Sequence, residues 1–296
     1  MIKKEEPLSE QGFFIDQVVV PGALEFPVGL DDSETGTDVD YSYYVSKHEV
    51  SYKLWKEIFD WAASPARGSE RYYFENEGVM GNRIPDNPIF IQNNELHPVT
   101  GISWWDAVVW CNALTEYYNV EKGETLRCVY TNDGAILRDA RHHTINEVSI
   151  HAEHASGYRL PTSIEWELAA RYVNGYTWDV RGNHVSGDSS GSCYPENDEA
   201  SIVFGDYAWY KGNSRIVGST HPGGEKAPNH LGVYDMSGNV WELCWDHYSI
   251  LSGPSYRIKR GGSFRSDAED LQLGIVKMHY QTMTSDDVGF RTVRTK

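Results

Sequence analysis

The stretch GYRLPTSIEWELAAR, residues 157–171, decides how this chain folds. Thr162 and Glu165 have the spacing of a capping box, in which each side chain accepts a hydrogen bond from the other residue's backbone N–H. The apolar residues that follow recur at helical spacing, and they are Ile164, Leu168 and Ala169. We therefore predict an amphipathic helix that begins after Thr162.

Two further helices are expected on the N-terminal side of this stretch. SYKLWKEIFDWAAS (51–64) starts with a capping serine and has apolar residues at helical spacing. WWDAVVWCNALTEYY (104–118) follows Ser103, and Asp106 takes the place of the usual Glu in a capping box. This second run is apolar almost all round, which predicts a mostly buried helix.

Short apolar runs predict strands before the first helix and again in the last third of the chain. The expected strands are 18–20, 24–28, 43–50, 128–130, 232–234, 240–245, 256–261 and 289–293. The acidic stretch 31–40 and the Gly-, Asn- and Pro-rich stretch 64–95 are expected to be loops. Helices that come early and strands that come late predict an α+β fold. We expect a disordered tether over residues 1–16 and one domain over 17–296.

Charge and composition exclude several classes of partner. The chain has 296 residues and a formal net charge of -17, which argues against nucleic acid or an anionic membrane surface. No run of about 18 apolar residues occurs, so no membrane span is expected. The four cysteines form no CxxC pair, and a zinc ribbon is not expected. The charged opening MIKKEEPLSEQ fits a cytoplasmic start and equally an exported protein whose signal has been removed.

The segment GVYDMSGNVWELCWD (232–246) contains a candidate metal site. Asp235 and Glu242 flank the tight turn Ser237-Gly238-Asn239. Two carboxylates and turn carbonyls suit calcium, which takes six to eight oxygen ligands. The alternative is a turn satisfied internally, in which Asp235 caps backbone N–H groups and Glu242 meets a cation from another strand. The residue chemistry leaves both readings open.

Several segments together resemble the sulfatase-modifying, formylglycine-generating enzyme family. They are HPVTGISWWDAVVWCNAL (97–114), GYRLPTSIEWELAAR (157–171), GVYDMSGNVWE (232–242), KRGGSF (259–264) and VGFRTVR (288–294). The resemblance extends over roughly residues 17–294. It implies a C-type lectin-like fold with two main helices, small twisted antiparallel sheets and much ordered loop. It also matches the turn to a calcium site formed by Asp235, Gly238, Val240 and Glu242.

The enzymes of that family use two cysteines after the GGS motif, with copper and oxygen. The matching positions here are Ser266 and Leu271, and neither residue can supply a thiolate. The resemblance therefore implies a relative that is inactive as an oxidase and needs no copper. Relatives that make sulfoxides need an extra iron-binding helical domain, for which this chain has no room.

The C-terminal framework matches the family, but the interior between residues 264 and 287 departs from it. An intact scaffold around such a segment resembles the variable proteins of diversity-generating retroelements, in particular those of treponemes. The resemblance implies a ligand surface that mixes charged, aromatic and hydroxyl side chains. The expected ligand-binding residues are Arg265, Ser266, Asp267, Asp270, Ile275, Lys277, His279, Tyr280, Thr284 and Asp286.

We therefore expect a surface protein that binds a protein or glycan ligand, is not an enzyme, and uses calcium only structurally. Membrane contact is expected only through a lipid tether, as in an outer-membrane lipoprotein, although a cytoplasmic location stays open. One alternative is a fixed binding or structural paralogue of the family. Another is a divergent enzyme that uses His279 or a carboxylate pair among Asp267, Asp270 and Asp286.

Overall fold

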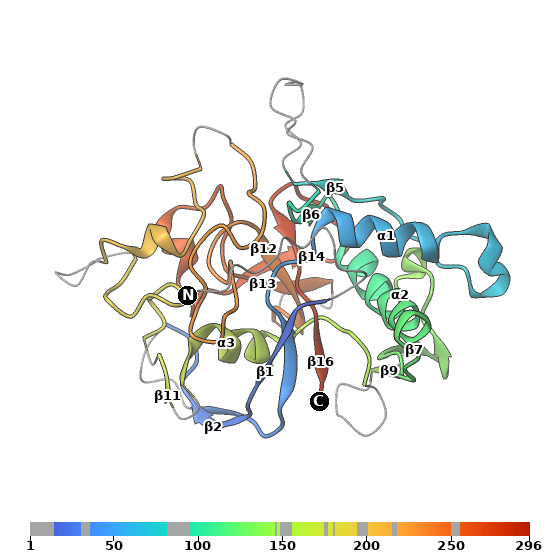
Figure 1. The fold of residues 1–296 in the computed structure, drawn as a ribbon, viewed down its shortest axis with the longest axis horizontal. Helices are drawn as coiled ribbons and strands as arrows, with labels where there is room; N and C mark the ends of the chain where they lie inside the picture. The colour runs from blue at the N-terminus through green and yellow to red at the C-terminus, as the bar shows by residue number, and fades with distance from the viewer. Residues whose placement is uncertain are drawn as a thin grey trace, which may run out of the picture.

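The computed structural model describes residues 15–30, 36–81, 95–145, 147–148, 156–174, 177–179, 181–193, 201–214, 218–249 and 255–296. Its three α-helices lie where the sequence predicts them: α1 (Tyr52–Ala62), α2 (Trp104–Lys122) and α3 (Ser163–Arg171). Among the described helices none is both long enough and apolar enough to cross a bilayer. α1 and α2 lie together on one side of the molecule, and α3 lies on the other (Figure 1).

The helix caps form as predicted. Ser51 Oγ accepts from Leu54 N (3.2 Å), and complete capping boxes start α2 and α3. At α2, Asp106 Oδ2 accepts from Ser103 N (2.9 Å), while its Oδ1 accepts from Glu75 N (2.8 Å) in the preceding loop. One carboxylate therefore both starts the helix and fixes the loop beside it.

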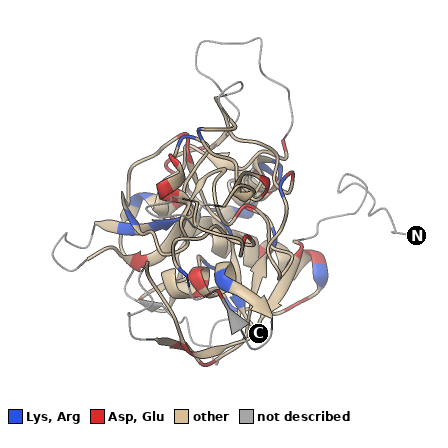
Figure 2. Cartoon of the chain, turned by 90° about the vertical axis from the view of Figure 1, so that its left-hand side faces the viewer, with Lys and Arg blue, Asp and Glu red and all other residues tan. Residues whose placement is uncertain are grey.

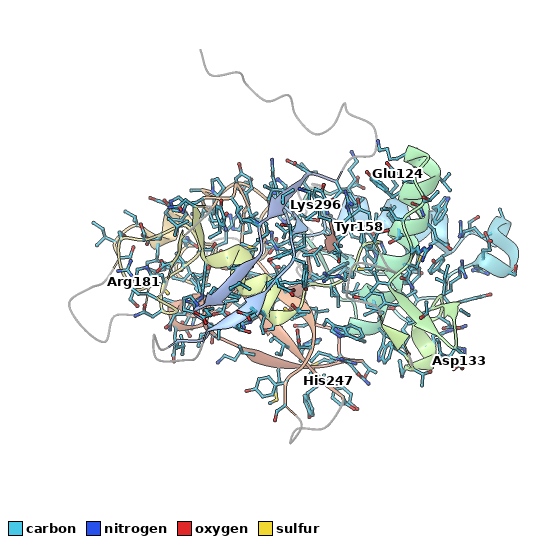
Figure 3. All side chains as sticks on the ribbon, turned by 90° about the horizontal axis from the view of Figure 1, so that it is seen from below. Glu124, Asp133, Tyr158, Arg181, His247 and Lys296 are labelled. Atoms are coloured by element: carbon cyan, nitrogen blue, oxygen red, sulfur yellow. The ribbon has the colours of Figure 1, made fainter. Side chains whose placement is uncertain are left out.

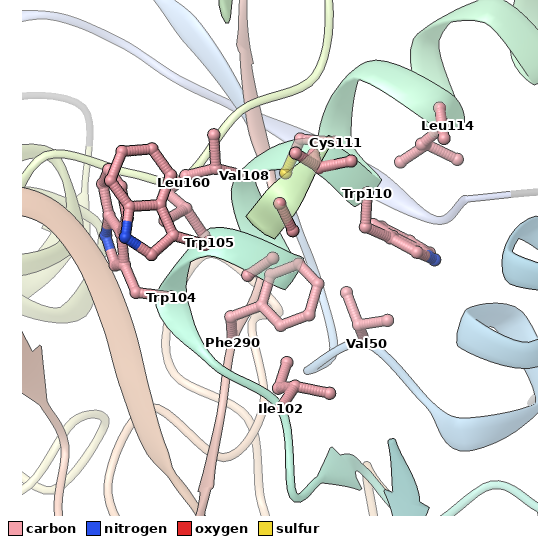
Figure 4. Close-up of a cluster of buried hydrophobic side chains, with 14 of the residues drawn as sticks. Val50, Ile102, Trp104, Trp105, Val108, Trp110, Cys111, Leu114, Leu160 and Phe290 are labelled. Carbon is pink, nitrogen blue, oxygen red and sulfur yellow. The ribbon is translucent and has the colours of Figure 1, made fainter. Parts of the chain in front are cut away.

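The larger hydrophobic core surrounds α2, as its uniformly apolar sequence predicts. Twelve consecutive residues of α2, from Trp104 to Thr115, are buried. The rings of Trp55 and Trp110 stack at 5.6 Å, and Phe290 meets both edge-on. Figure 4 shows Phe290 and Ile102 beside this helix, so the core joins the first, middle and last parts of the chain.

The strands are short and form six small sheets. Their bounds are β1 (Gln17–Val20), β2 (Ala23–Phe26), β3 (Thr37–Val39), β4 (Tyr43–Ser46), β5 (Val79–Met80), β6 (Val99–Thr100), β7 (Tyr130–Asn132), β8 (Ala135–Ile136), β9 (Glu147–Val148), β10 (Tyr172–Asn174), β11 (Thr177–Trp178), β12 (Trp241–His247), β13 (Tyr256–Arg260), β14 (Lys277–Tyr280), β15 (Val288–Gly289) and β16 (Val293–Thr295). Short 3₁₀ helices span Pro65–Glu70, Ala140–His142, Phe204–Asp206 and Ala268–Leu271.

Two of these sheets organise the fold. One has the order β1-β4-β16 and joins both ends of the domain. The other has the order β14-β13-β12-β15 and carries the C-terminal segments of interest. β15 runs parallel to β12, which departs from the expected all-antiparallel pairing. The chain leaves β14 at the far edge and crosses back to the opposite edge, so it arrives in the parallel direction.

Buried ion pairs join α3 to the strands. The Arg159 guanidinium contacts both Glu165 oxygens at 2.6 Å. Glu167 lies between Arg171 (2.6 Å) and Arg260 of β13 (2.7 Å), and all five side chains are buried. The glutamates of EWE therefore do not face solvent, because each is neutralised by arginine inside the protein.

Some of the predicted strands and loops are wrong. Residues 232–234 form no strand, since Asn229 Oδ1 accepts from the backbone N–H groups of Leu231 and Val233 and closes a turn. β3 lies inside the expected loop 31–40, where it pairs with β2. The run 289–293 is divided between β15 and β16, and β14 was not predicted. The expected tether, residues 1–16, lies almost wholly outside the described residues.

Candidate functional site

The predicted ligand-binding segment, residues 264–287, is attached to the scaffold through its backbone. Leu271 and Leu273 are buried. Leu273 N donates to His184 O (2.9 Å), and Gly274 N donates to Gly182 O (2.8 Å). Gly274 leaves no room for a side chain, since a Cβ there would lie 2.2 Å from the Gly29 oxygen. The backbone of the segment is therefore held at fixed points between its exposed side chains.

Six charged residues at this surface form three ion pairs. Arg265 contacts Asp286 (2.5 Å), Lys277 contacts Asp270 (3.0 Å), and Asp267 contacts Lys211 (2.8 Å) from outside the segment. All six side chains are at least 30% exposed, so each pair contributes at most about 1 kcal/mol. A ligand can therefore open these pairs at little cost. The three carboxylates suggested for an acid–base pair are each held by a different cation.

Two of the predicted ligand-binding side chains face inward. Ser266 is buried, and its Oγ accepts from Ser263 N (3.1 Å). His279 is 4% exposed, and its Nε2 donates to the Met283 carbonyl oxygen (3.0 Å). Burial lowers the pKa of His279 to about 4, so the imidazole is neutral at pH 7. Ile275 is half-buried against the larger core. Tyr280 and Thr284 are exposed.

Sequence reasoning missed the exposed methionines of this surface. Met278 and Met283 are each 55% exposed, and Tyr280 is 39% exposed. The sequence signal for Met278 is weak, because alternation over only four residues, KMHY, places it on the same face as Tyr280. Tyr256 of β13 meets Tyr280 edge-on at 5.3 Å. The described surface therefore carries sulfur and aromatic side chains next to its ion pairs.

No cysteine occupies the positions that the family's oxidases use. Ser266 and Leu271 are both buried. The chain's four cysteines lie elsewhere and form no disulfide. Burial raises the pKa of Cys128 and Cys193 to about 12, and it raises the pKa of Cys111 and Cys244 as well. All four are therefore thiols at neutral pH, whereas copper ligation needs a thiolate.

At the candidate calcium turn, Glu242 faces an arginine. Arg291 Nε and Nη2 contact its two carboxylate oxygens at 2.6 Å each, and Trp166 Nε1 donates to Oε2 (2.8 Å). All three side chains are buried. This arrangement is the internally satisfied alternative, in which Glu242 meets a cation from another strand.

The carboxylate of Asp235 has fewer hydrogen-bond partners than that of Glu242. Its Oδ2 accepts from Gly224 N (2.8 Å), whereas Oδ1 is buried without a hydrogen-bond partner. Glu49 is also buried nearby, where it accepts from Asn239 Nδ2 (2.6 Å) and Val240 N (3.1 Å). Burial raises the pKa of Asp235 to about 6 and raises that of Glu49 well above its usual range. Three buried carboxylates therefore share one arginine.

These contacts bear on whether calcium fits the turn. Within the described ranges, no three His, Cys, Asp or Glu side chains gather closely enough to hold a metal. Glu242 does not fit as a ligand in this arrangement, because both of its oxygens pair with Arg291. Gly238 adopts φ +89°, and a Cβ there would lie 2.2 Å from the Trp209 oxygen. Calcium bound through Asp235 and the carbonyls of Gly238 and Val240 stays a prediction.

Comparison with known proteins settles the family. The sulfatase-modifying factor enzyme 1-like domain matches residues 8–296, nearly the whole chain. The chain belongs to this family. The α+β architecture, with three helices and several small sheets, is that of the family fold.

Three relatives show how the family resemblance is distributed. "Chaperone protein LppX" of Paenibacillus barcinonensis is 31% identical over 266 residues, which cover 86% of this chain and 80% of that protein. The crystal structure of CarF superposes with a TM-score of 0.67 at 29% identity, covering 95% of this chain and 98% of CarF. Treponema denticola variable protein 1 has a TM-score of 0.64 at 22% identity, with 95% of each chain covered, and shares the fold.

Proposed function

We propose that this family member binds a protein or glycan ligand through residues 264–287 and does not act as an oxidase. The observation that carries the proposal is a backbone held by buried residues between exposed side chains. Leu271, Leu273 and His279 are buried, whereas Arg265 and Tyr280 are exposed. Such a frame allows exposed side chains to change without loss of the fold.

We further propose that this surface is diversified by a retroelement and displayed outside the cell by a lipid tether. The shared fold of Treponema denticola variable protein 1 supports only the scaffold part of this idea. The exposed positions mix charge, hydroxyl, sulfur and aromatic groups, which supports a binding role for the surface. Aromatic and arginine side chains are common anchors at binding interfaces.

A second candidate is a chaperone with a fixed client surface. The relative from Paenibacillus barcinonensis carries the name chaperone. Exposed Met278 and Met283 favour this candidate, because methionine adapts its shape to different apolar partners. Both candidates place the ligand on the same surface, and they differ in whether its residues vary.

Sequencing of the gene's 3′ end across sibling clones tests the proposal. A diversified protein predicts substitutions confined to codons 264–287 and concentrated at exposed positions such as 265, 278 and 280. Codons for buried Leu271 and Leu273 should stay constant and serve as the internal control. An invariant segment, with no near-copy of it close to the gene, would remove the diversification proposal and favour the chaperone.

A binding assay tests the ligand surface itself. The full chain and a variant carrying Arg265→Ala, Tyr280→Ala and Thr284→Ala would be applied to a protein array and a glycan array. The control is Val120→Ala, because Val120 is also exposed (68%, against 39% for Tyr280) but lies on α2. The proposal expects signals that the triple variant loses and the control keeps. Signals that all three proteins share would contradict it.

A further inference from the structure

The four-stranded sheet ends in an edge strand, β14, that begins with Lys277 and also contains Met278 and Tyr280. β14 pairs only with β13 in the order β14-β13-β12-β15 of the described strands. Figure 3 places His247, at the end of β12, at the margin of the molecule where this sheet ends. The free backbone groups of an edge strand can pair with strands of other chains. Monomeric proteins usually prevent this pairing with charged residues, proline or a bulge in the edge strand.

The register shows which backbone groups of β14 point away from β13. Tyr256 faces Tyr280, Arg257 faces His279 and Ile258 faces Met278. Gln281 N donates to Ser255 O (2.9 Å) one pair further along, so that pair is of the hydrogen-bonded type. Bonded and non-bonded pairs alternate in an antiparallel ladder. The Arg257–His279 pair is then bonded, and the backbone groups of Met278 and Tyr280 point outward.

An independent hydrogen bond supports this assignment. Tyr256 O accepts from Tyr248 N of the β12 side (2.9 Å), so the backbone of Tyr256 faces away from β14. At the outer edge, the Tyr280 carbonyl oxygen accepts a hydrogen bond from Met283 N (2.9 Å). Among the hydrogen bonds between described residues, three groups are left for a partner: Met278 N–H, Met278 C=O and Tyr280 N–H.

The side chains of the same residues provide an apolar surface beside these groups. Met278 and Tyr280 share one face of the sheet with Ile258 and Tyr256, since paired residues lie on the same side. Neither outward position carries a charge or a proline. The edge therefore combines free backbone groups with exposed sulfur and aromatic side chains.

We infer that β14 accepts an extended segment of a partner protein as an additional strand. This inference rests on the proposed function, because it names the partner class and binding mode of the same surface. An added strand would supply hydrogen-bond partners for the three free backbone groups. It would also place alternate apolar side chains against Met278 and Tyr280. The net charge of the whole surface selects its composition, since residues 264–287 contain five acidic and two basic residues. The partner segment should carry basic residues around an apolar centre.

A second copy of this chain is a poorer occupant. Two chains with a formal net charge of -17 each repel one another, and Figure 2 shows acidic residues on many segments of the chain. Light scattering of the purified chain should therefore report a monomer. A dimer that Met278→Pro converts to monomer would overturn the assignment to a partner protein.

Selection of phage-displayed random dodecapeptides on the immobilised full chain provides the probe. The inference expects peptides that alternate apolar and polar residues between basic flanks. Each selected peptide would be resynthesised with single N-methylated residues. Alternate N–H groups of the bound peptide face β14, so N-methylation at every second residue should weaken binding about tenfold. N-methylation of the residues between them should leave binding unchanged.

Met278→Pro is the matching change in the protein. Proline removes an outward N–H and leaves the ladder to β13 intact, so an unchanged melting temperature and a loss of affinity of about tenfold are expected. If this variant unfolds, the N-methylated peptides still test strand addition, because that experiment uses the unaltered protein.

The outcomes separate the two proposals. Peptides whose binding is lost with Tyr280→Ala, but which bind equally well when any residue is N-methylated, would overturn strand addition. That result would still support the proposed binding surface. Peptides that bind elsewhere, unaffected by Tyr280→Ala and Met278→Pro, would overturn strand addition as well. The array experiment then judges the proposed function separately.

Discussion

Replacing Arg291 tests the buried network that supports the C-terminal part of the domain. Arg291 is fully buried, and it contacts both oxygens of Glu242. It also donates to the carbonyl oxygens of Ser46 (3.1 Å) and Tyr234 (2.9 Å). Arg291→Met therefore leaves a buried carboxylate without its cation and two carbonyls without a donor.

The expected cost follows from these contacts. Loss of one partner of a buried ion pair destabilises a protein by about 3–5 kcal/mol. For a domain of this size, each kcal/mol lowers the melting temperature by about 2–4 °C. We therefore expect Arg291→Met to lower it by roughly 6–20 °C.

Arg265→Met is the matched control. Arg265 makes one ion pair with Asp286 and is 53% exposed, so its loss should cost less than about 1 kcal/mol. Urea unfolding and calorimetry of both variants give the comparison. A double change, Arg291→Met with Glu242→Leu, should recover most of the loss, because it removes the uncompensated charge. Equal, small losses for Arg291→Met and Arg265→Met would refute this account of the core.

Three other predictions concern acid, calcium and oxidation. The pKa of His279 is lowered from about 6.5 in the unfolded chain to about 4, so its stabilising effect is present above pH 6.5 and is lost as the pH falls toward 4. Between pH 7 and 5 the wild type should lose about 2 kcal/mol more unfolding free energy than His279→Gln, and equal losses would contradict this. Millimolar calcium should raise the melting temperature of the wild type but not of Asp235→Asn, with magnesium as the control; an unchanged wild type would exclude the site. With copper and oxygen, the chain should leave the cysteine of a sulfatase peptide unoxidised in a mass-spectrometric assay, since Ser266 and Leu271 occupy the cysteine positions, and any formylglycine product would overturn the inactive assignment.

Local signals predicted the helices well. The caps at Ser51, Ser103 and Thr162 are formed by residues three apart, and periodicity within one helix reveals its buried face. These features need no knowledge of distant parts of the chain. The same holds for the strand around residue 256, where a short apolar alternation is bounded by turns.

The errors have several causes. Asn229 converts an apolar run into a turn through its side chain, a feature that hydrophobic pattern does not report. β14 has the alternation of a strand over only four residues, which is too short a pattern to separate from loop. The sequence left open whether Glu242 binds a metal or pairs with a cation, because Arg291 lies 49 positions away.

The candidate site stays a prediction, and the sequence alone does not give the burial of its side chains. An interior that departs from the family pattern singled out these residues, of which Arg265, Asp267 and Tyr280 are exposed in the structure. The imidazole of His279 is buried where it contacts the Met283 carbonyl oxygen after the turn at 281–283, whereas Ser266 is buried against Ser263. The pairing of Asp267 with Lys211 depends on a loop 56 positions earlier in the chain.

The sheet that holds both ends of the domain has a consequence for synthesis. β16 pairs with β4, and Ser46 contacts Thr292 across 246 positions of sequence. Contacts between such distant residues slow folding, and this one cannot form until Thr292 has been translated and has left the ribosome. Residues 264–287 emerge just before that strand. A substituted residue in this segment is therefore translated after α1, α2 and α3 and before β16, the strand that completes the sheet.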